Sequence, residues 1–236
     1  MEYKIEIDIV LPCYNPPENW EKQMISNFKH LQSRFEDIYF HLIIVSDGSR
    51  QGYEPERITK IKETIPHIKI IDYRPNRGKG YALREAVKYS ESPYTIYTDY
   101  DFPYTDESMQ AVIEALLNGA DIVVAVRDRN YQDGLPTFRK FLSKASHLCN
   151  QYLLRLDIKD TQGGLKGFNK TGREIFLSTH ISGFLFDTEF IYKGQKRKVN
   201  IQPVSARIKD GLAISNMGMK VLRKEAMNFF SILFNR

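Results

Sequence analysis

The chain has 236 residues and a formal net charge of +5, with 42% hydrophobic and 27% charged residues. This size suits one large domain with an ample core, and no stretch reaches the roughly 18 apolar residues that span a bilayer. The start lacks the cleavage site of a signal peptide, and Cys13 and Cys149 lack metal-ligand spacing, so we expect reduced thiols in a cytoplasmic protein.

The first half of the chain alternates short apolar runs with helical patterns. Residues 20–35 place apolar side chains at spacings of three and four, and residues 109–116 do the same before Gly119, where a helix can end. Alternating strands and helices predict a largely parallel sheet with right-handed crossovers. The runs that predict strands covered on both faces are residues 7–14, 40–47, 68–74, 94–101 and 121–128.

Polar residues follow three of these predicted strands. Asn15 follows the first, the segment 47–49 ends the second, and Asp99 and Asp101 end the fourth. In parallel sheets, ligands bind beyond the carboxyl ends of the strands. The sequence therefore predicts a ligand site at this edge of the sheet.

Asp99 and Asp101 are separated by one residue at the end of an apolar run. In a strand this spacing puts both carboxylates on one side, where they can share a Mg²⁺ or Mn²⁺ ion with water and substrate phosphates. Such an ion stabilises a diphosphate as a leaving group. The structural alternative is that Asp101 caps a turn before Pro103 and that Asp106 is the N-cap of the next helix. The pattern alone leaves both interpretations open.

Two other turns are equally ambiguous when taken alone. Asp47 precedes Gly and Ser, which is ordinary turn chemistry, but its carboxylate could also accept a hydrogen bond from a nucleotide base. Residues 74–87 form a Gly-rich loop that opens a helix, and its N–H groups, Arg77 and Lys79 favour an anion. The glycines of that loop also suit a simple strand-to-helix turn, and the loop matches neither a Walker motif nor G-x-G-x-x-G.

The second half of the chain is less regular and ends in a basic segment. Residues 193–236 hold ten Lys and Arg against two acidic residues, a net charge of +8 that leaves −3 for the rest. This asymmetry favours an anionic partner, such as a phosphate-bearing ligand or a membrane surface, over a merely solvated basic face. The expected elements are a long amphipathic helix at 135–156, a helix near 171–179, a strand at 199–208 and a C-terminal amphipathic helix.

Taken in order, the motifs resemble glycosyltransferase family 2, the inverting nucleotide-sugar enzymes with the GT-A fold. The matching stretches are IVLPCYNPPENW, IIVSDGSRQG, NRGKGYALREAV, YTDYDFPY and DTQGGLKGFNK. The last, followed by GFLFDTEF, is most similar to the polyprenyl-phosphate (dolichyl-phosphate) glucosyl- and mannosyltransferases. The resemblance implies a single α/β GT-A domain over residues 1–212, Rossmann-like with a mostly parallel sheet flanked by helices. A basic amphipathic helix would follow over residues 213–236.

The resemblance also implies roles for individual residues. Asp99 and Asp101 would bind the metal, and Gln162 would lie beside the sugar or the acceptor. For a hydroxyl acceptor a base is needed, and Asp187 is the first candidate and Glu189 the second, although either carboxylate could instead pair with a nearby basic residue. The nucleotide-sugar site would comprise Pro12, Tyr14, Asn15, Asp47, Arg77, Lys79 and Asp99, with Arg207 or Lys209 reaching the diphosphate.

The implied reaction is inverting transfer of a hexose from UDP-glucose or GDP-mannose, with Mg²⁺ or Mn²⁺ as cofactor. The acceptor would be polyprenyl phosphate, which is already anionic and needs positive charge rather than a base, or a sugar hydroxyl in cell-surface polysaccharide synthesis. The C-terminal helix would lie peripherally on the cytoplasmic face of a membrane or pack on the core.

Two other classes stay open at this point, a non-catalytic nucleotide-binding protein and a phosphohydrolase of the aspartyl-phosphate type. The second class normally carries its Asp-x-Asp motif near its start. No nucleic acid is expected as a partner, because no basic and aromatic reading module accompanies the charge.

Overall fold

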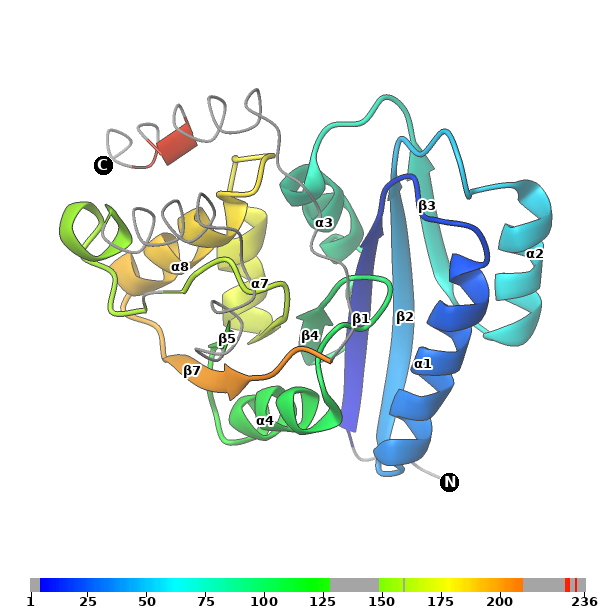
Figure 1. Cartoon of the computed structure of the whole chain (residues 1–236). Coiled ribbons are helices and arrows are strands. Elements are labelled where there is room, and N and C mark those ends of the chain that lie inside the picture. Colours follow the sequence, from blue (N-terminus) through cyan, green and yellow to red (C-terminus); the bar gives the residue numbers. More distant parts are fainter. Residues whose placement is uncertain (1–4, 128–148, 159, 210–227, 230–231, 233–236) are drawn as a thin grey trace.

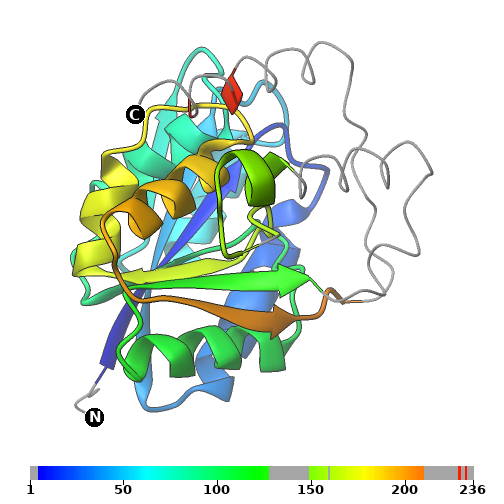
Figure 2. The same cartoon turned by 90° about the vertical axis from the view of Figure 1, so that its left-hand side faces the viewer.

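The chain folds around a seven-stranded sheet with helices on both faces (Figures 1 and 2). The computed structural model describes residues 5–127, 149–158, 160–209, 228–229 and 232. The strands are β1 (Ile5–Cys13), β2 (Ile38–Asp47), β3 (Lys69–Tyr73), β4 (Tyr94–Tyr97), β5 (Ile122–Arg127), β6 (Lys166–Asn169) and β7 (Ile201–Ala206). The helices are α1 (Trp20–Arg34), α2 (Pro55–Thr64), α3 (Lys79–Val87), α4 (Asp106–Leu117), α7 (Lys170–Leu177) and α8 (Phe186–Lys196), with a short π-helical segment at Cys149–Leu153.

The strand order β3-β2-β1-β4-β6-β5-β7 makes a mostly parallel sheet. β1 pairs in parallel with β2 and β4, β2 with β3, and β5 with β7, whereas β6 runs antiparallel between β4 and β5. The last seven residues of β1 are all buried, as expected for a strand covered on both faces. The carboxyl ends of β1, β2 and β4 therefore lie along one edge, as predicted.

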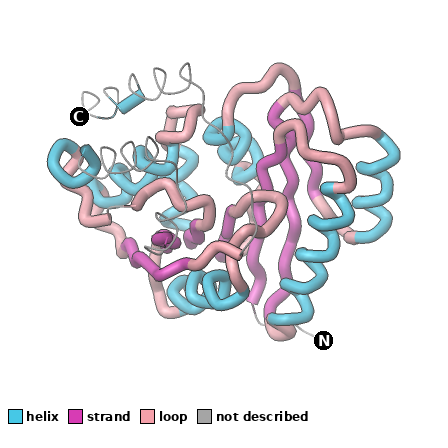
Figure 3. The backbone as a smooth tube through the Cα atoms, in the orientation of Figure 1, coloured by secondary structure: helices cyan, strands magenta, loops and turns pink. Residues whose placement is uncertain are grey.

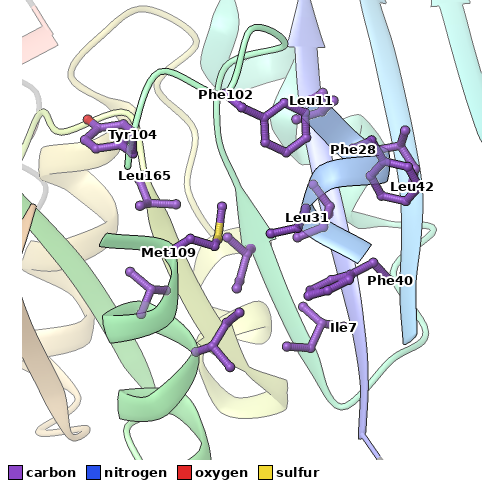
Figure 4. Packing of buried hydrophobic residues seen from close by; sticks show 14 of the residues in the cluster. Ile7, Leu11, Phe28, Leu31, Phe40, Leu42, Phe102, Tyr104, Met109 and Leu165 are labelled. Atoms are coloured by element: carbon purple, nitrogen blue, oxygen red, sulfur yellow. The ribbon is translucent and has the colours of Figure 1, made fainter. Parts of the chain in front are cut away.

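Each face of the sheet has its own hydrophobic core, and Figure 3 shows the helices on either side of the strands. On one face, α1, α2 and α4 contribute Trp20, Ile61 and Met109 to a cluster that includes Leu11 and Phe40, part of which is drawn in Figure 4. On the other face, α3, α7 and α8 contribute their apolar sides, among them Leu83, Phe176 and Phe190. The apolar spacing of the sequence is thus explained by helices packed on a two-sided sheet.

The strand predicted over residues 94–101 is shorter than expected, because β4 ends at Tyr97. Asp99 and Asp101 lie in the turn that follows, so strand alternation does not place them. β6 and α2 lie in segments for which the sequence predicts no strand or helix, and the segment 183–195, equally without a predicted element, forms most of α8. The remaining predicted strands of the first half differ from the observed ones by at most two residues at either end.

Two predicted helices fall largely outside the described residues. Of the amphipathic segment 135–156, residues 149–156 are described and begin with the π-helical segment. Of the C-terminal helix over 213–236, the structure describes residues 228, 229 and 232, which are helical. Within the described part of the chain, no helix is both long and apolar enough to cross a bilayer.

Candidate active site

The strand ends bring the predicted site residues to one edge of the sheet. In the parallel register Cys13 of β1 lies opposite Ser46 of β2, and Val10 lies opposite Tyr97 of β4. Asn15, Asp47 and Asp99 follow or end these three strands. Three segments distant in sequence therefore converge because the strands are parallel and in register.

The turn that carries Asp99 and Asp101 is held by its backbone and by one apolar anchor. The N–H of Phe102 donates to the Asp99 carbonyl at 3.0 Å, and the Asn27 side chain donates to the Asp101 carbonyl at 2.9 Å. Phe102 is 5% exposed and packs into the core beside Leu11 (Figure 4). This leaves the Asp99 carboxylate at the edge, with 41% of its side chain exposed.

The alternative interpretation, in which Asp106 is the N-cap of the next helix, is wrong. Thr105 is the N-cap position of α4, and Asp106 is the first helical residue. The Asp106 carboxylate lies 2.7 Å from His30 Nε2 instead.

Burial and the neighbouring Asp99 raise the pKa of Asp101 above its ordinary value, as expected for two carboxylates that share a site.

Lys79, the first residue of α3, is the direct counter-ion of this acidic pair. Its Nζ lies 2.5 Å from Asp99 Oδ1. Burial alone would lower the pKa of Lys79, but Asp99, Asp187 and Asp101 outweigh it and raise that pKa. The predicted site residues Lys79, Asp99 and Asp101 therefore form one cluster of opposite charges.

Asp47, the last residue of β2, organises the loop before α3. Its carboxylate accepts hydrogen bonds from the Tyr73 hydroxyl at 2.7 Å, the Asn76 side chain at 2.8 Å, and the N–H groups of Arg77 at 2.7 Å and Gly78 at 2.8 Å. A buried carboxylate with four donors is fully satisfied. Asp47 therefore shapes the Gly-rich loop, and its direct contact with a base stays a prediction.

The other residues assigned to the nucleoside pocket lie around this loop. The N–H of Asn15 donates to Ser49 Oγ at 3.1 Å, and its side-chain oxygen accepts from the N–H of Arg50 at 2.7 Å. Tyr14 is 54% exposed, and the exposed Arg77 lies over the Tyr81 ring, 4.8 Å from its centroid. Asn15 thus joins the loops after β1 and β2, while Tyr14 and Arg77 offer an aromatic and a guanidinium surface. The remaining member of this predicted set, Pro12, is buried in β1 opposite Val45.

Beneath the acidic turn lies a buried ion pair that sequence reasoning did not identify. Lys166 of β6 is 0% exposed, and its Nζ lies 2.8 Å from Asp187 Oδ1 and donates to the Gly163 carbonyl at 2.6 Å. The Tyr97 hydroxyl donates to the same Asp187 oxygen. Burial lowers the pKa of Lys166, and burial raises that of Asp187 against the opposing effect of Lys166. The sequence offers little signal for this pair, because Lys166 begins a strand of four residues, Lys-Gly-Phe-Asn.

Glu189, the second predicted base, instead binds the backbone of the loop at residues 180–182. Its carboxylate accepts from the N–H groups of His180 and Ile181 at 2.9 and 2.8 Å, and Lys193 Nζ lies 2.9 Å away. From the other side, the buried Arg84 of α3 donates to the carbonyls of His180 and Ile181 at 3.1 and 2.7 Å. The Gly80 N–H donates to the Ser182 carbonyl at 3.0 Å, so this loop also supports the start of α3.

Gln162 is exposed, and the segment around it is fixed by its neighbours. Asp160 forms a bidentate ion pair with Arg127, with both distances 2.8 Å, and Arg127 lowers the pKa of Asp160 despite its burial. The Gly164 N–H donates to the Tyr104 hydroxyl at 2.7 Å. Gly164 also lies so close to the acidic turn that a Cβ there would be 2.9 Å from Asp99 Oδ2.

The basic residues after β7 are brought to the acidic turn by backbone pairing. The carbonyl of Arg207 accepts from the Thr105 N–H at 3.0 Å, and the Lys209 N–H donates to the Pro103 carbonyl at 2.8 Å. Lys209 lies close enough to lower the pKa of Asp101. Both predicted diphosphate residues therefore border the Asp-x-Asp turn.

The donor set of this edge fits a divalent ion that is shared with a phosphate ligand. Asp99 and Asp101 supply carboxylate oxygens, which Mg²⁺ and Mn²⁺ prefer. Among the described residues, no group of three or more His, Cys, Asp and Glu side chains could hold a metal by itself. Two carboxylates flanked by lysines suit an ion whose other ligands come from a bound diphosphate and water.

The sequence profile of glycosyl transferase family 2 matches residues 8–176. The chain belongs to glycosyltransferase family 2. The matched region runs from the start of the buried part of β1 to α7 and includes the Asp-x-Asp turn and the buried Lys166.

Several relatives are similar over most of the chain. Dolichyl-phosphate beta-glucosyltransferase of Dictyostelium discoideum is 28% identical over 85% of this chain and 65% of its own length. The Drosophila melanogaster enzyme of the same name is 24% identical over 86% and 67%. Dolichol-phosphate mannosyltransferase of Pyrococcus furiosus is 23% identical over 83% and 54%. The chain therefore spans about half to two thirds of the length of these relatives.

Solved structures share the fold. Glucosyl-3-phosphoglycerate synthase from Mycobacterium tuberculosis, in complex with Mn²⁺, UDP-glucose and phosphoglyceric acid, superposes with a TM-score of 0.67 at 16% identity. The superposition covers 98% of this chain and 79% of that one. This likeness confirms the predicted GT-A architecture, with its mostly parallel sheet flanked by helices.

Proposed function

We propose that this chain transfers a hexose from a nucleoside-diphosphate sugar to polyprenyl phosphate, with inversion at the anomeric carbon. The observation that carries the proposal is the cluster at the sheet edge, where Asp99 and Asp101 lie beside Lys79 and Lys209 from two other segments. Adjacent carboxylates and ammonium groups on a rigid edge suit a diphosphate that binds together with a divalent ion. The names of the similar enzymes, which act on dolichyl phosphate, support the acceptor class.

In this proposal Asp99 and Asp101 hold Mg²⁺ or Mn²⁺, which when bound neutralises charge on the departing diphosphate. Lys79 and Lys209 offer further positive charge to the phosphates, and Arg207 lies two residues before Lys209 in sequence. Tyr14, Asn15 and Arg77 border the nucleoside, over the loop that Asp47 shapes. The structural neighbour glucosyl-3-phosphoglycerate synthase forms complexes with UDP and Mn²⁺ or Mg²⁺, which supports this choice of cofactor and donor.

The acceptor follows from the state of the two candidate bases. Asp187 is bound to Lys166 and Tyr97, and Glu189 is bound to two backbone N–H groups and Lys193. Both carboxylates are engaged by these partners, so protonating either one would break a buried ion pair and its hydrogen bonds. An acceptor phosphate is already a nucleophile and needs no base, so polyprenyl phosphate fits this site better than a sugar hydroxyl.

The lipid acceptor also suits the charge distribution of the chain. A polyprenyl phosphate lies in a membrane, and the segment 193–236 carries a net charge of +8. We propose that the amphipathic segment 213–236 contacts the cytoplasmic face of a membrane, where anionic lipids attract basic residues.

The decisive experiment compares Asp101→Asn with Asp106→Asn, the same change five residues away at an acidic position that pairs with His30. Binding of UDP, UDP-glucose, GDP and GDP-mannose is measured by calorimetry with Mn²⁺ or Mg²⁺, and transfer to polyprenyl phosphate is measured by chromatography. We expect Asp101→Asn to lose at least about 100-fold in metal-dependent donor affinity, which corresponds to about 2.7 kcal/mol. Asp106→Asn should bind and transfer like the wild type.

Two results would count against the proposal. Equal donor affinity in Asp101→Asn and the wild type would remove the metal site from the acidic turn. Donor binding with transfer to a sugar hydroxyl, and none to polyprenyl phosphate, would leave the donor half intact and overturn the acceptor.

A further inference from the structure

Lys79 is held at the acidic turn by a rigid frame rather than by a flexible surface loop. The Gly78 N–H donates to Asp47 Oδ2 at 2.8 Å, and the Gly80 N–H donates to the Ser182 carbonyl at 3.0 Å. A Cβ at Gly78 would be 2.3 Å from the Ser182 oxygen, so the backbone on both sides of Lys79 packs against its neighbours with no spare room. These contacts therefore fix the backbone position from which the Lys79 side chain reaches Asp99.

The charges around Lys79 leave Asp99 as its principal partner. Asp187, the next carboxylate that acts on Lys79, is already neutralised by Lys166 at 2.8 Å. Asp99, in contrast, has its Oδ1 at 2.5 Å from Lys79 Nζ. The ammonium of Lys79 thus supplies a positive charge at the carboxylate of Asp99, which would also hold a divalent ion.

A divalent ion held by Asp99 would compete with the Lys79 ammonium for the same carboxylate. An ion that binds alone would have to displace Lys79 and leave a partly buried ammonium beside a new positive charge, which is unfavourable. A diphosphate changes this balance, because its oxygens offer Lys79 another anionic partner. Release of Lys79 from Asp99 then accompanies binding of the diphosphate.

We propose that Lys79 makes metal binding at the acidic turn conditional on the nucleoside diphosphate, by occupying Asp99 until the diphosphate takes over its ammonium group. This inference rests on the proposed function, since it assumes that the same turn binds metal and diphosphate. Linkage makes the effect reciprocal, so the diphosphate tightens the metal by the same factor as the metal tightens the diphosphate. The site would then fill with ion and donor together.

The test measures Mn²⁺ affinity by electron paramagnetic resonance and calorimetry, without nucleotide and with saturating UDP or GDP, after correction for Mn²⁺ bound by free nucleotide. The variants are Lys79→Met, which keeps the stem without the charge, and Lys79→Arg, which keeps the charge. Lys88→Met is the matched control, because Lys88 lies just beyond the same helix and pairs with Glu85. Circular dichroism and thermal unfolding verify that each variant is folded.

In the wild type and in Lys88→Met, nucleotide should tighten Mn²⁺ about tenfold or more, within the usual range of coupling between sites. In Lys79→Met, Mn²⁺ alone should bind about tenfold tighter than in the wild type. Nucleotide should tighten Mn²⁺ less than in the wild type, because ligation by the diphosphate remains but the release of Lys79 from Asp99 does not contribute. Lys79→Arg should keep most of the coupling.

The outcomes separate this inference from the proposed function. If Lys79→Met binds Mn²⁺ alone as weakly as the wild type, while the wild type still binds Mn²⁺ with nucleotide, the inference on Lys79 is overturned and the proposed function stands. If the wild type binds neither Mn²⁺ nor nucleotide, both are overturned.

Discussion

Replacing Asp187 by asparagine tests the buried ion pair beneath the site. Lys166 is 0% exposed and Asp187 is 5% exposed, and the two are 2.8 Å apart. Removing one partner of such a pair leaves an uncompensated buried charge, which costs about 3–5 kcal/mol. A domain of ordinary stability, about 5–15 kcal/mol, should remain folded but markedly weakened.

Lys166→Met removes the other partner and leaves Asp187 with the Tyr97 hydroxyl alone, so we expect a loss of similar size. In the double variant neither charge remains, and the introduced asparagine side chain keeps an oxygen for the Tyr97 hydroxyl. The double variant should therefore be more stable than the sum of the two single changes implies, by about 2–3 kcal/mol. This difference is the coupling energy of the pair.

Urea unfolding measures all four proteins, with the fluorescence of Trp20 as the probe. Trp20 is the single tryptophan and is 1% exposed, so it reports loss of the core. Lys193→Met is the control, because Lys193 pairs with Glu189 on the same helix but is 28% exposed, and its loss should cost about 1 kcal/mol or less. Single changes at Lys166 and Asp187 that cost under about 1 kcal/mol, or that add without coupling, would refute the buried-pair argument.

Two further substitutions test the geometry of the site and of the core. Gly164→Ala would put a Cβ 2.9 Å from Asp99 Oδ2. The Asp99 carboxylate can rotate away, so thermal stability should change little. The Mn²⁺-dependent affinity for UDP should fall at least about tenfold, which corresponds to about 1.4 kcal/mol. Gly119→Ala is its counterpart, since Gly119 has φ +91° and an added Cβ would meet no atom within 4 Å. It should lose about 1 kcal/mol of stability with UDP affinity intact; the opposite pattern in calorimetry would contradict both expectations. Burial raises the pKa of Asp8 above its ordinary 3.8, so ionised Asp8 destabilises the fold at neutral pH and this penalty disappears as the pH falls below the unfolded pKa. In Asp8→Asn the amide oxygen can still accept from the Ser92 N–H, while the amide NH₂ donates to Ser92 Oγ. The change should raise the melting temperature by about 2–4 °C at pH 8 and by much less at pH 4, whereas an equal gain at both values would mean that charge is not the cause.

The parts of the fold that sequence predicts well are those governed by burial on two faces. β1 and β2 read as continuous apolar runs because helices cover both sides of the sheet. The strand ends then follow from the polar residues at which the runs stop, such as Asp47. Because the strands are parallel, their carboxyl ends lie at one edge of the sheet. Residues as far apart in sequence as Asn15 and Asp99 could therefore be assigned to one site.

The parts that sequence misses depend on tertiary partners. β6 has four residues with a lysine at its first position and a glycine at its second, so neither its length nor its composition indicates a strand. It forms because β4 and β5 flank it and because Lys166 finds Asp187 in α8. α2 is short and buries only Ile61 among its residues, so its apolar signal is equally weak.

The acidic turn shows where the geometric premise of the predicted metal site is incomplete. In sequence, strand alternation places the carboxylates of Asp99 and Asp101 on one side, yet β4 ends at Tyr97. The turn is held instead by the Phe102 N–H on the Asp99 carbonyl and by the buried Phe102 ring. Apolar anchoring of a turn residue cannot be distinguished in sequence from one more residue of a strand, because both place an aromatic side chain in an apolar run.

The two candidate bases illustrate the same limit with a consequence for the reaction. In sequence, Asp187 and Glu189 are two carboxylates near the end of a family motif, and nothing in their spacing distinguishes a free base from a buried partner. The structure gives Asp187 an ammonium and a phenol, and gives Glu189 two amides and an ammonium. Bound in this way, Asp187 stabilises the buried pair with Lys166, and Glu189 stabilises the loop beside α3. Accepting a proton in each turnover would break these contacts. Among the described residues, both candidate bases are thus occupied by partners, and this favours the acceptor that we propose, a phosphate that arrives already ionised, over a hydroxyl.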